Sequence, residues 1–162
     1  KYPKEAAEIA YRYLADNHVP CLLYQGRNNL FNREPEEEGI LDQASKYGSG
    51  FVAFSPLAQG LLTGRYLDGI PDDSRIARGG HLKKEALTED VLRKIRDLNE
   101  IAARRGQTLA EMSLAWLLKD EKVTSVIIGA SSVKQIDDNL KSLDNTSFCD
   151  EEICLINNVL SR

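Results

Sequence analysis

Apolar residues along this chain follow two alternating patterns, short continuous runs and longer stretches with helical spacing. The continuous runs lie at 20–25, 51–54 and 125–129 and predict strands, and the run at 20–25 is typical of a strand that is covered on both faces. Apolar residues three and four positions apart predict amphipathic helices, which we expect at 3–16, 35–47, 88–105, 108–118, 131–143 and from Asp150 onward. The intervening segment 55–87 has no periodicity, which is typical of a lid or a binding loop.

Residue types at the helix ends support these boundaries. Acidic side chains at 36–38 suit the positive end of a helix macrodipole, and Gly106 suits a helix end. Thr108 and Glu111 have the spacing of a capping box, in which each side chain accepts a hydrogen bond from the other residue's backbone N–H. We therefore expect a single helix at 35–47 and a break between the two helices on either side of Gly106.

Strands that alternate with helices predict a parallel sheet in an α/β fold, either doubly wound or closed into a barrel. The three strands are too few for the number of helices, so we expect this chain to be part of a larger fold. Ligands of parallel sheets bind at the carboxyl ends of the strands. Two of the predicted strands end in turns of small and polar residues, at 55–60 and 129–132, and these turns predict a nucleotide or phosphate site.

The turn at 129–132 is well placed for an anion, because free backbone N–H groups at a helix start can hold a phosphate. The alternative is an ordinary helix cap by Ser131 or Ser132, which the sequence alone favours. Arg65, Arg75 and Lys134 are solvated charges when taken singly, but together they would suit a phosphate. Residues 48–53 match the letters of a dinucleotide fingerprint, yet they precede a strand where the fingerprint must follow one.

Composition narrows the classes of function. The 162 residues are 42% hydrophobic, which is enough for one core. Positive and negative side chains are mixed along the chain and the net charge is −4, so we expect no nucleic-acid partner. No apolar run reaches the roughly 18 residues of a membrane span, and residues 1–4 lack the apolar core of a signal peptide. We therefore expect no membrane partner and a soluble, cytoplasmic protein.

The cysteines and histidines do not indicate a metal site. Cys21, Cys149 and Cys154 have no CxxC spacing, so we expect free thiols, with Cys21 and Cys154 packed in the interior. His18 and His81 have no cysteine or carboxylate companions at ligand spacing, so we expect neither metal binding nor general-base work from them.

A series of segments, in order along the chain, resembles the C-terminal half of the aldo-keto reductases. The segments are Tyr24-Gln25, residues 29–33 (NLFNR), 54–66 (FSPLAQGLLTGRY), 70–75 (IPDDSR) and 129–132 (GASS) with Gln135 and Asn139. The likeness covers essentially the whole chain. It points to the branch that contains bacterial glyceraldehyde 3-phosphate reductases and the β-subunits of voltage-gated potassium channels.

The resemblance implies a (β/α)8 TIM barrel of which residues 1–162 form the C-terminal part, with about three parallel strands and the N-terminal half absent. It also implies reduction of a small carbonyl substrate, an aldehyde or a ketone, by NADPH that lies extended across the C-terminal face of the barrel. The implied cofactor residues are Gln25 at the nicotinamide carboxamide, Phe54 on the nicotinamide ring, Ser55, Pro56, Leu57, Gln59 and Gly60 along the pyrophosphate, Arg65 and Arg75 at the phosphates, and Gly129, Ser131, Gln135, Asp138 and Asn139 at the adenosine end with its 2′-phosphate.

Two departures from the family bear on function. Relatives commonly carry Pro and an aromatic residue between the strand-end Gln and the Asn-Leu pair, where this chain has Gly26, Arg27 and Asn28. The family's catalytic Asp, Tyr, Lys and His belong to the N-terminal half, so the resemblance implies that this chain holds no catalytic residue and is inactive alone. Two alternatives stay open: a non-catalytic nucleotide-binding regulatory subunit, and a half-barrel that assembles with its missing half or as a homo-oligomer.

Overall fold

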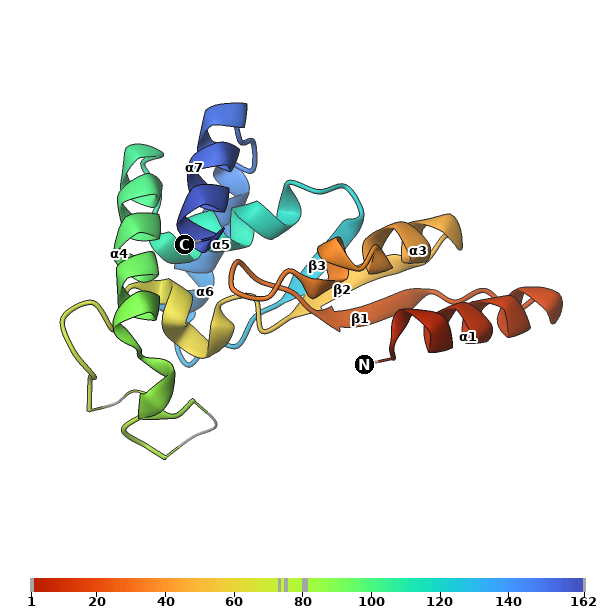
Figure 1. Ribbon diagram of the computed structural model, residues 1–162, viewed down its shortest axis with the longest axis horizontal. Helices are drawn as coiled ribbons and strands as arrows, with labels where there is room; N and C mark the ends of the chain where they lie inside the picture. The colour runs from red at the N-terminus through yellow and green to blue at the C-terminus, as the bar shows by residue number, and fades with distance from the viewer. Residues whose placement is uncertain (1, 73, 75, 80–81, 162) are drawn as a thin grey trace. The chain divides into compact units, whose positions relative to one another are not determined.

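The computed structural model describes residues 2–72, 74, 76–79 and 82–161 (Figure 1). The chain forms two compact units. Unit 1 consists of Lys1–Pro56 with Leu117–Gly129, and unit 2 consists of Leu57–Trp116 with Ala130–Arg162. Unit 1 contains the whole sheet, and unit 2 contains most of the helices.

The sheet of unit 1 has three parallel strands in the order β1-β2-β3. They are β1 (Leu23–Arg27), β2 (Gly50–Phe54) and β3 (Val123–Ile127). The predicted parallel arrangement is confirmed, but β1 begins later than the predicted 20–25 and β3 begins earlier than the predicted 125–129. The apolar runs mark where strands occur, whereas pairing with β2 sets their limits, and Pro20 has no N–H to donate to a ladder.

Only one face of the sheet is covered by helices of unit 1. Along β1 the exposure alternates, with Tyr24 and Gly26 buried and the residues on either side of them exposed. Helices α1 (Lys4–Asp16) and α3 (Ile40–Lys46) supply side chains to the core on the buried face. That core consists of Ala7, Tyr11, Tyr24, Ile40, Leu41, Ala44, Phe51, Ala53, Leu117 and Val123.

The opposite face, which we call the open face, carries Gln25 and Arg27 of β1 and their neighbours on β2 and β3. Its apolar side chains stay partly in solvent, since Leu23 is 50% and Ile127 is 47% exposed. The expectation that the strand at 20–25 is covered on both faces is therefore wrong for the described chain. The apolar runs include side chains of both faces, and the helices of unit 1 cover only one of them.

The helix expected at 35–47 is two helices. A short helix, α2, covers Glu34–Glu37, and α3 begins at Ile40. Gly39 lies between them with a left-handed φ of 71°. A left-handed residue cannot continue an α-helix, and glycine adopts this conformation without a Cβ penalty. The acidic run at 36–38 therefore belongs to a separate turn of helix.

Unit 2 is built from helices. They are the 3-10 helices η1 (Ala58–Thr63), η2 (Lys84–Ala86) and η3 (Lys141–Asp144), and the α-helices α4 (Glu89–Arg104), α5 (Leu109–Leu118, which ends in unit 1), α6 (Val133–Leu140) and α7 (Asp150–Ser161). The segment 55–87 is thus not wholly irregular. The predicted capping box is confirmed, because Thr108 N donates to Glu111 Oε2 at 2.8 Å and Glu111 N donates to Thr108 Oγ1 at 3.2 Å.

Helices α4 and α7 lie side by side, as Figure 1 shows, and Arg105 joins them. Its side chain is 2% exposed, follows directly after α4 and forms a 2.6 Å ion pair with Glu152 of α7. The guanidinium also donates to the Ser147 carbonyl at 2.9 Å and lies 3.7 Å from the ring centre of Phe148. This one side chain therefore fixes the segment that leads into α7.

All three cysteines are free thiols, as predicted. Cys21 is half-buried, but Cys154 is exposed, so its expected place in the interior is wrong. Ile156 and Val159 form the buried face of α7, and Cys154 lies off that face. Across the described ranges, no three His, Cys, Asp or Glu side chains are grouped as metal ligands would be. None of the helices described there combines the length and apolarity that a bilayer crossing requires.

Candidate functional site

In unit 1, residues of the predicted site gather at the carboxyl edge of the sheet. Gln25 lies within β1 on the open face, Ser55 follows β2 directly, and Gly129 lies two residues beyond β3. Because the three strands are parallel, these ends meet at one edge. The carboxyl ends of the three strands therefore lie on the same side of the sheet, but β1 continues two residues beyond Gln25, where the sequence predicts the strand end.

The register of the ladder arranges the open face in two tiers. Gln25 is paired with Val52, which is paired with Ser125. One pleat further along, Arg27 is paired with Phe54, which is paired with Ile127. The tier nearest the carboxyl edge therefore combines a cation, an aromatic ring and an aliphatic side chain, while Gln25 lies one tier deeper.

The turn after β2 has an unusual backbone. Ser55, Ala58 and Gln59 have φ values of 54°, 47° and 58°, and Gly60 has a φ of 103°. A left-handed conformation costs a residue other than glycine about 1–3 kcal/mol, and it persists only where surrounding interactions hold it. Such strained turns cluster at binding sites, so this turn is the part of the chain whose backbone most clearly indicates a site.

Hydrogen bonds inside each unit hold parts of this turn. In unit 1, Asn29 Nδ2 donates to the Ser55 carbonyl at 2.9 Å, and Asn28 N donates to the Phe54 carbonyl at 3.4 Å. In unit 2, Gly60 N donates to the Leu57 carbonyl at 2.8 Å, and Thr63 Oγ1 donates to the Gly60 carbonyl at 2.7 Å.

Asn29 also belongs to this site, although the sequence patterns do not mark it as a binding residue. It is fully buried, and its Oδ1 accepts a 3.0 Å hydrogen bond from Phe31 N. Its backbone forms a two-way bridge with Asn32. A cluster of asparagines immediately after a strand end was the available signal, since buried amide side chains must find partners and often fix turns.

In unit 2, the residues predicted for the adenosine end surround the start of α6. Ser132 is the N-cap, because its Oγ accepts from Gln135 N at 3.3 Å. Ser131 has different partners: its N and its Oγ both donate to Gln135 Oε1, at 2.8 and 3.2 Å. The predicted helix cap by Ser131 or Ser132 is therefore confirmed with Ser132 as the cap, and the two donors of Ser131 share one exposed side-chain oxygen.

Further along α6, Asp138 accepts from two lysines. Lys134 Nζ lies 2.5 Å from one carboxylate oxygen and Lys141 Nζ lies 2.9 Å from the other. These hydrogen bonds and charges, with Lys134 the larger cause, lower the pKa of Asp138. Asn139 is half-buried beside them. The end of this site thus carries an ionised carboxylate flanked by two cations.

The remaining predicted residues are divided between the units and the undescribed positions. Pro56 is buried, while Phe54, Leu57, Gln59 and Gly60 are half-buried. Arg65 is exposed. Arg75, like His81, lies outside the described residues.

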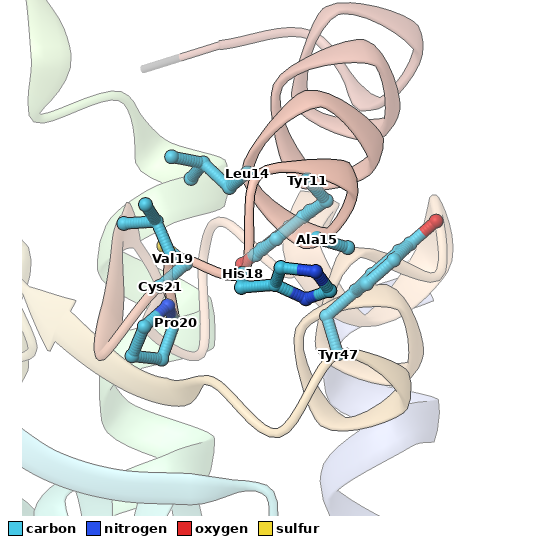
Figure 2. Close-up of a pocket in the computed structure, with 8 residues that line it drawn as sticks. All are labelled: Tyr11, Leu14, Ala15, His18, Val19, Pro20, Cys21 and Tyr47. Atoms are coloured by element: carbon cyan, nitrogen blue, oxygen red, sulfur yellow. The ribbon is translucent and has the colours of Figure 1, made fainter.

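A separate hollow lies at the opposite end of β1 (Figure 2). Its volume is about 290 Å³, and its lining comes from the end of α1, residues 18–21 and Tyr47. Tyr47 stacks on Tyr11 with ring centres 4.7 Å apart. This hollow holds none of the predicted site residues and precedes the strand, whereas ligands of parallel sheets bind beyond the strand's carboxyl end.

Comparison with known proteins shows one consistent likeness. The model of the Aldo/keto reductase family matches residues 3–161. The L-glyceraldehyde 3-phosphate reductase of Escherichia coli (strain K12) is 45% identical over 159 residues, which are 96% of this chain and 46% of that protein. The probable voltage-gated potassium channel subunit beta of Oryza sativa subsp. japonica is 42% identical over 129 residues, 78% of this chain and 39% of that protein.

Solved structures agree in fold. The glycerol dehydrogenase of Gluconobacter oxydans superposes with a TM-score of 0.77 at 25% identity, over 100% of this chain and 47% of that one. The thermostable aldo-keto reductase Tm1743 superposes with a TM-score of 0.68 at 24% identity, over 98% of this chain and 46% of that one. This chain thus spans less than half the length of these proteins, and its three parallel strands with their helices are part of a TIM barrel.

Proposed function

Because this chain belongs to the aldo/keto reductase family, we propose that the intact protein reduces an aldehyde or a ketone with NADPH. In this proposal the chain supplies most of the cofactor site and no catalytic acid. The intact protein is a cytoplasmic oxidoreductase, and it needs the part of the barrel that this chain does not span.

The observation that carries the proposal is the strained turn after β2. Left-handed φ values at Ser55, Ala58 and Gln59 turn successive peptide groups away from regular hydrogen bonding. Such a turn at the carboxyl edge of a parallel sheet suits a ligand with phosphate groups, because it offers backbone N–H groups to the anion. In the proposal, Ser55, Pro56, Leu57, Gln59 and Gly60 follow the pyrophosphate.

The other cofactor residues are chemically suited to the parts assigned to them. The side-chain amide of Gln25 can donate to and accept from a carboxamide, and the ring of Phe54 offers a stacking surface. Arg65 and Arg75 carry the charge that phosphate groups need. The adenosine end is held by Gly129, Ser131, Gln135, Asp138 and Asn139. There the 2′-phosphate takes the place of Gln135 Oε1 as the acceptor of the two hydrogen bonds from Ser131.

When bound, NADPH supplies the hydride for reduction of a carbonyl group. The chain's residues bind and orient that cofactor, and the proton for the carbonyl oxygen comes from elsewhere in the intact protein. The contacts of two tyrosines support this division. Tyr24 points to the helix-covered face and donates to the Tyr2 carbonyl at 2.8 Å, and Tyr47 donates to Glu8 at 2.7 Å.

A second candidate is a nucleotide-binding regulatory subunit without catalysis. The observation that favours it is the 42% identity to the probable potassium channel subunit over 78% of this chain. In this alternative the same turn and the same adenosine residues bind the nucleotide, and no substrate is turned over.

One experiment separates the candidates. The full-length protein and the 162-residue chain are each mixed with NADPH and a panel of aldehydes, and NADPH absorbance and fluorescence are followed. We expect turnover by the full-length protein and none by the chain alone. Binding without turnover by the full-length protein would establish the regulatory alternative. Turnover by the chain alone would place a catalytic acid among its own residues, with Tyr24, Tyr66 and His81 as the first to replace.

A further inference from the structure

Arg27 stands where the open face of the sheet meets its carboxyl edge. It is the last residue of β1, and its Cα is paired with that of Phe54. Side chains two residues apart on a strand share a face, so Arg27 lies on the same face as Gln25 and about 6.6 Å further along the strand. Arg27 is therefore one tier outside the glutamine that we assign to the nicotinamide.

Gly26 explains why the strand continues as far as Arg27. Its side-chain position faces the helix-covered side, where a Cβ would lie 2.6 Å from Cζ of Phe51. Phe51 is fully buried and packs against Tyr24 with ring centres 5.9 Å apart. Glycine at 26 thus lets the Phe51 ring pack against the strand, and the ladder stays paired through Arg27.

The guanidinium of Arg27 is exposed, and in the part of the chain that the structure describes it forms no ion pair or side-chain hydrogen bond. Four other cations of unit 1 differ: Arg12, Lys46, Arg33 and Lys122 are paired with Glu8, Glu36 or Asp42. An arginine is always charged and presents a planar fork that matches carboxylate and phosphate oxygens. Arg27 is thus the cation of the open face that is available to an anion.

We propose that Arg27 determines substrate specificity by binding an anionic group, a phosphate or a carboxylate, of the carbonyl substrate. This inference rests on the proposed reductase function. It follows from the place of Arg27 next to Phe54, because a substrate that meets the nicotinamide must extend past this tier toward solvent. The charge of Arg27 selects for substrates whose outer end is negative.

The test compares substrates that differ in that group. Using the full-length protein, kcat/KM is measured for glyceraldehyde 3-phosphate, for succinate semialdehyde and for neutral glyceraldehyde. Arg27→Gln should lower kcat/KM for an anionic aldehyde by about tenfold to a hundredfold, the range for one charged hydrogen bond, and leave neutral glyceraldehyde within about twofold. Arg27→Lys should recover part of the loss, since it keeps the charge without the fork.

The controls separate this inference from the proposed function. Arg12→Gln removes the same charge from α1, which covers the other face, and should leave all three substrates unchanged. Whichever of glyceraldehyde 3-phosphate and succinate semialdehyde loses more kcat/KM in Arg27→Gln shows whether Arg27 binds a phosphate or a carboxylate. If Arg27→Gln lowered kcat/KM equally for charged and neutral aldehydes, or lowered NADPH affinity by the same factor, the role of Arg27 would be overturned. The proposed reductase function would still stand. Failure of the unaltered protein to reduce any aldehyde would overturn the reductase function and this inference with it.

Discussion

The side-chain amide of Asn29 donates a 2.9 Å hydrogen bond to the backbone carbonyl of Ser55. Asn29 is fully buried, and Ser55 has a left-handed φ of 54°. The loop after β1 thus holds the strained backbone after β2, and a residue with no assigned ligand contact fixes the geometry of the turn that we assign to the pyrophosphate.

Replacing Asn29 by Ala should therefore reduce both stability and cofactor affinity. The change leaves the half-buried Ser55 carbonyl without this donor, which costs about 1–3 kcal/mol. Urea unfolding and NADPH titration of the full-length protein measure the two effects. Asn17→Ala is the control, because Asn17 also donates to a carbonyl, that of Tyr13 at 2.8 Å, but does so on the surface of α1. Unchanged NADPH affinity in Asn29→Ala would separate Asn29 from the cofactor site.

Ser131→Ala should weaken NADPH more than NADH. If its hydroxyl meets the 2′-phosphate, the substitution removes one charged hydrogen bond of about 1.5–3 kcal/mol that NADH never makes, while the backbone N–H of residue 131 stays in place. Ser132→Ala is the matched control, since it removes the N-cap of α6 at a cost of about 1 kcal/mol in stability and should not discriminate between the cofactors. Fluorescence titrations with both nucleotides measure these affinities. If Ser131→Ala weakened NADPH and NADH equally, the adenosine end would be wrongly assigned.

Unit 1 should lose stability in acid because the stabilising contribution of the Glu8 carboxylate is lost there. Hydrogen bonds from Tyr47 and Gln43, with smaller contributions from Arg12 and Lys46, lower the pKa of Glu8 from 4.5 to about 2. A carboxylate with a lowered pKa stabilises the fold above its unfolded pKa, and this contribution is lost as the pH falls from 4.5 toward 2. Unfolding midpoints in urea across that range should fall less steeply in Glu8→Gln than in the unaltered protein.

The control for this acid dependence is Glu5→Gln, an exposed carboxyl on the same helix. It should keep the pH profile of the unaltered protein. Identical profiles for Glu8→Gln and Glu5→Gln would show that the bonds to Tyr47 and Gln43 do not couple α1 to α3.

Arg105→Ala should be strongly destabilising for unit 2. The substitution removes the ion pair to Glu152, whose side chain is 27% exposed, and the bond to the Ser147 carbonyl, and the loss of hydrogen bonds to a charged group costs about 1.5–3 kcal/mol. Arg104→Ala, one residue earlier at the exposed end of α4, should change stability by less than about 0.5 kcal/mol. Urea unfolding compares them, and similar values would assign Arg105 no role in holding α7.

Local patterns in the sequence determined much of this structure. The apolar runs located all three strands, and the spacing of Thr108 and Glu111 identified the capping box. The segments from Tyr24 to Asn139 identified the family. These features depend on neighbouring residues, whose propensities and hydrogen bonds act within a few positions of each other.

The tertiary structure decided what depends on distant residues. The ladder between β1 and β2 sets which residue pairs with Phe54, so only the register shows that Arg27 shares the open face with Gln25. The break at Gly39 and the exposure of Cys154 likewise depend on how helices pack. Strand register and helix orientation follow from side chains far apart in the chain, because shifting a strand by one residue moves every side chain to the opposite face.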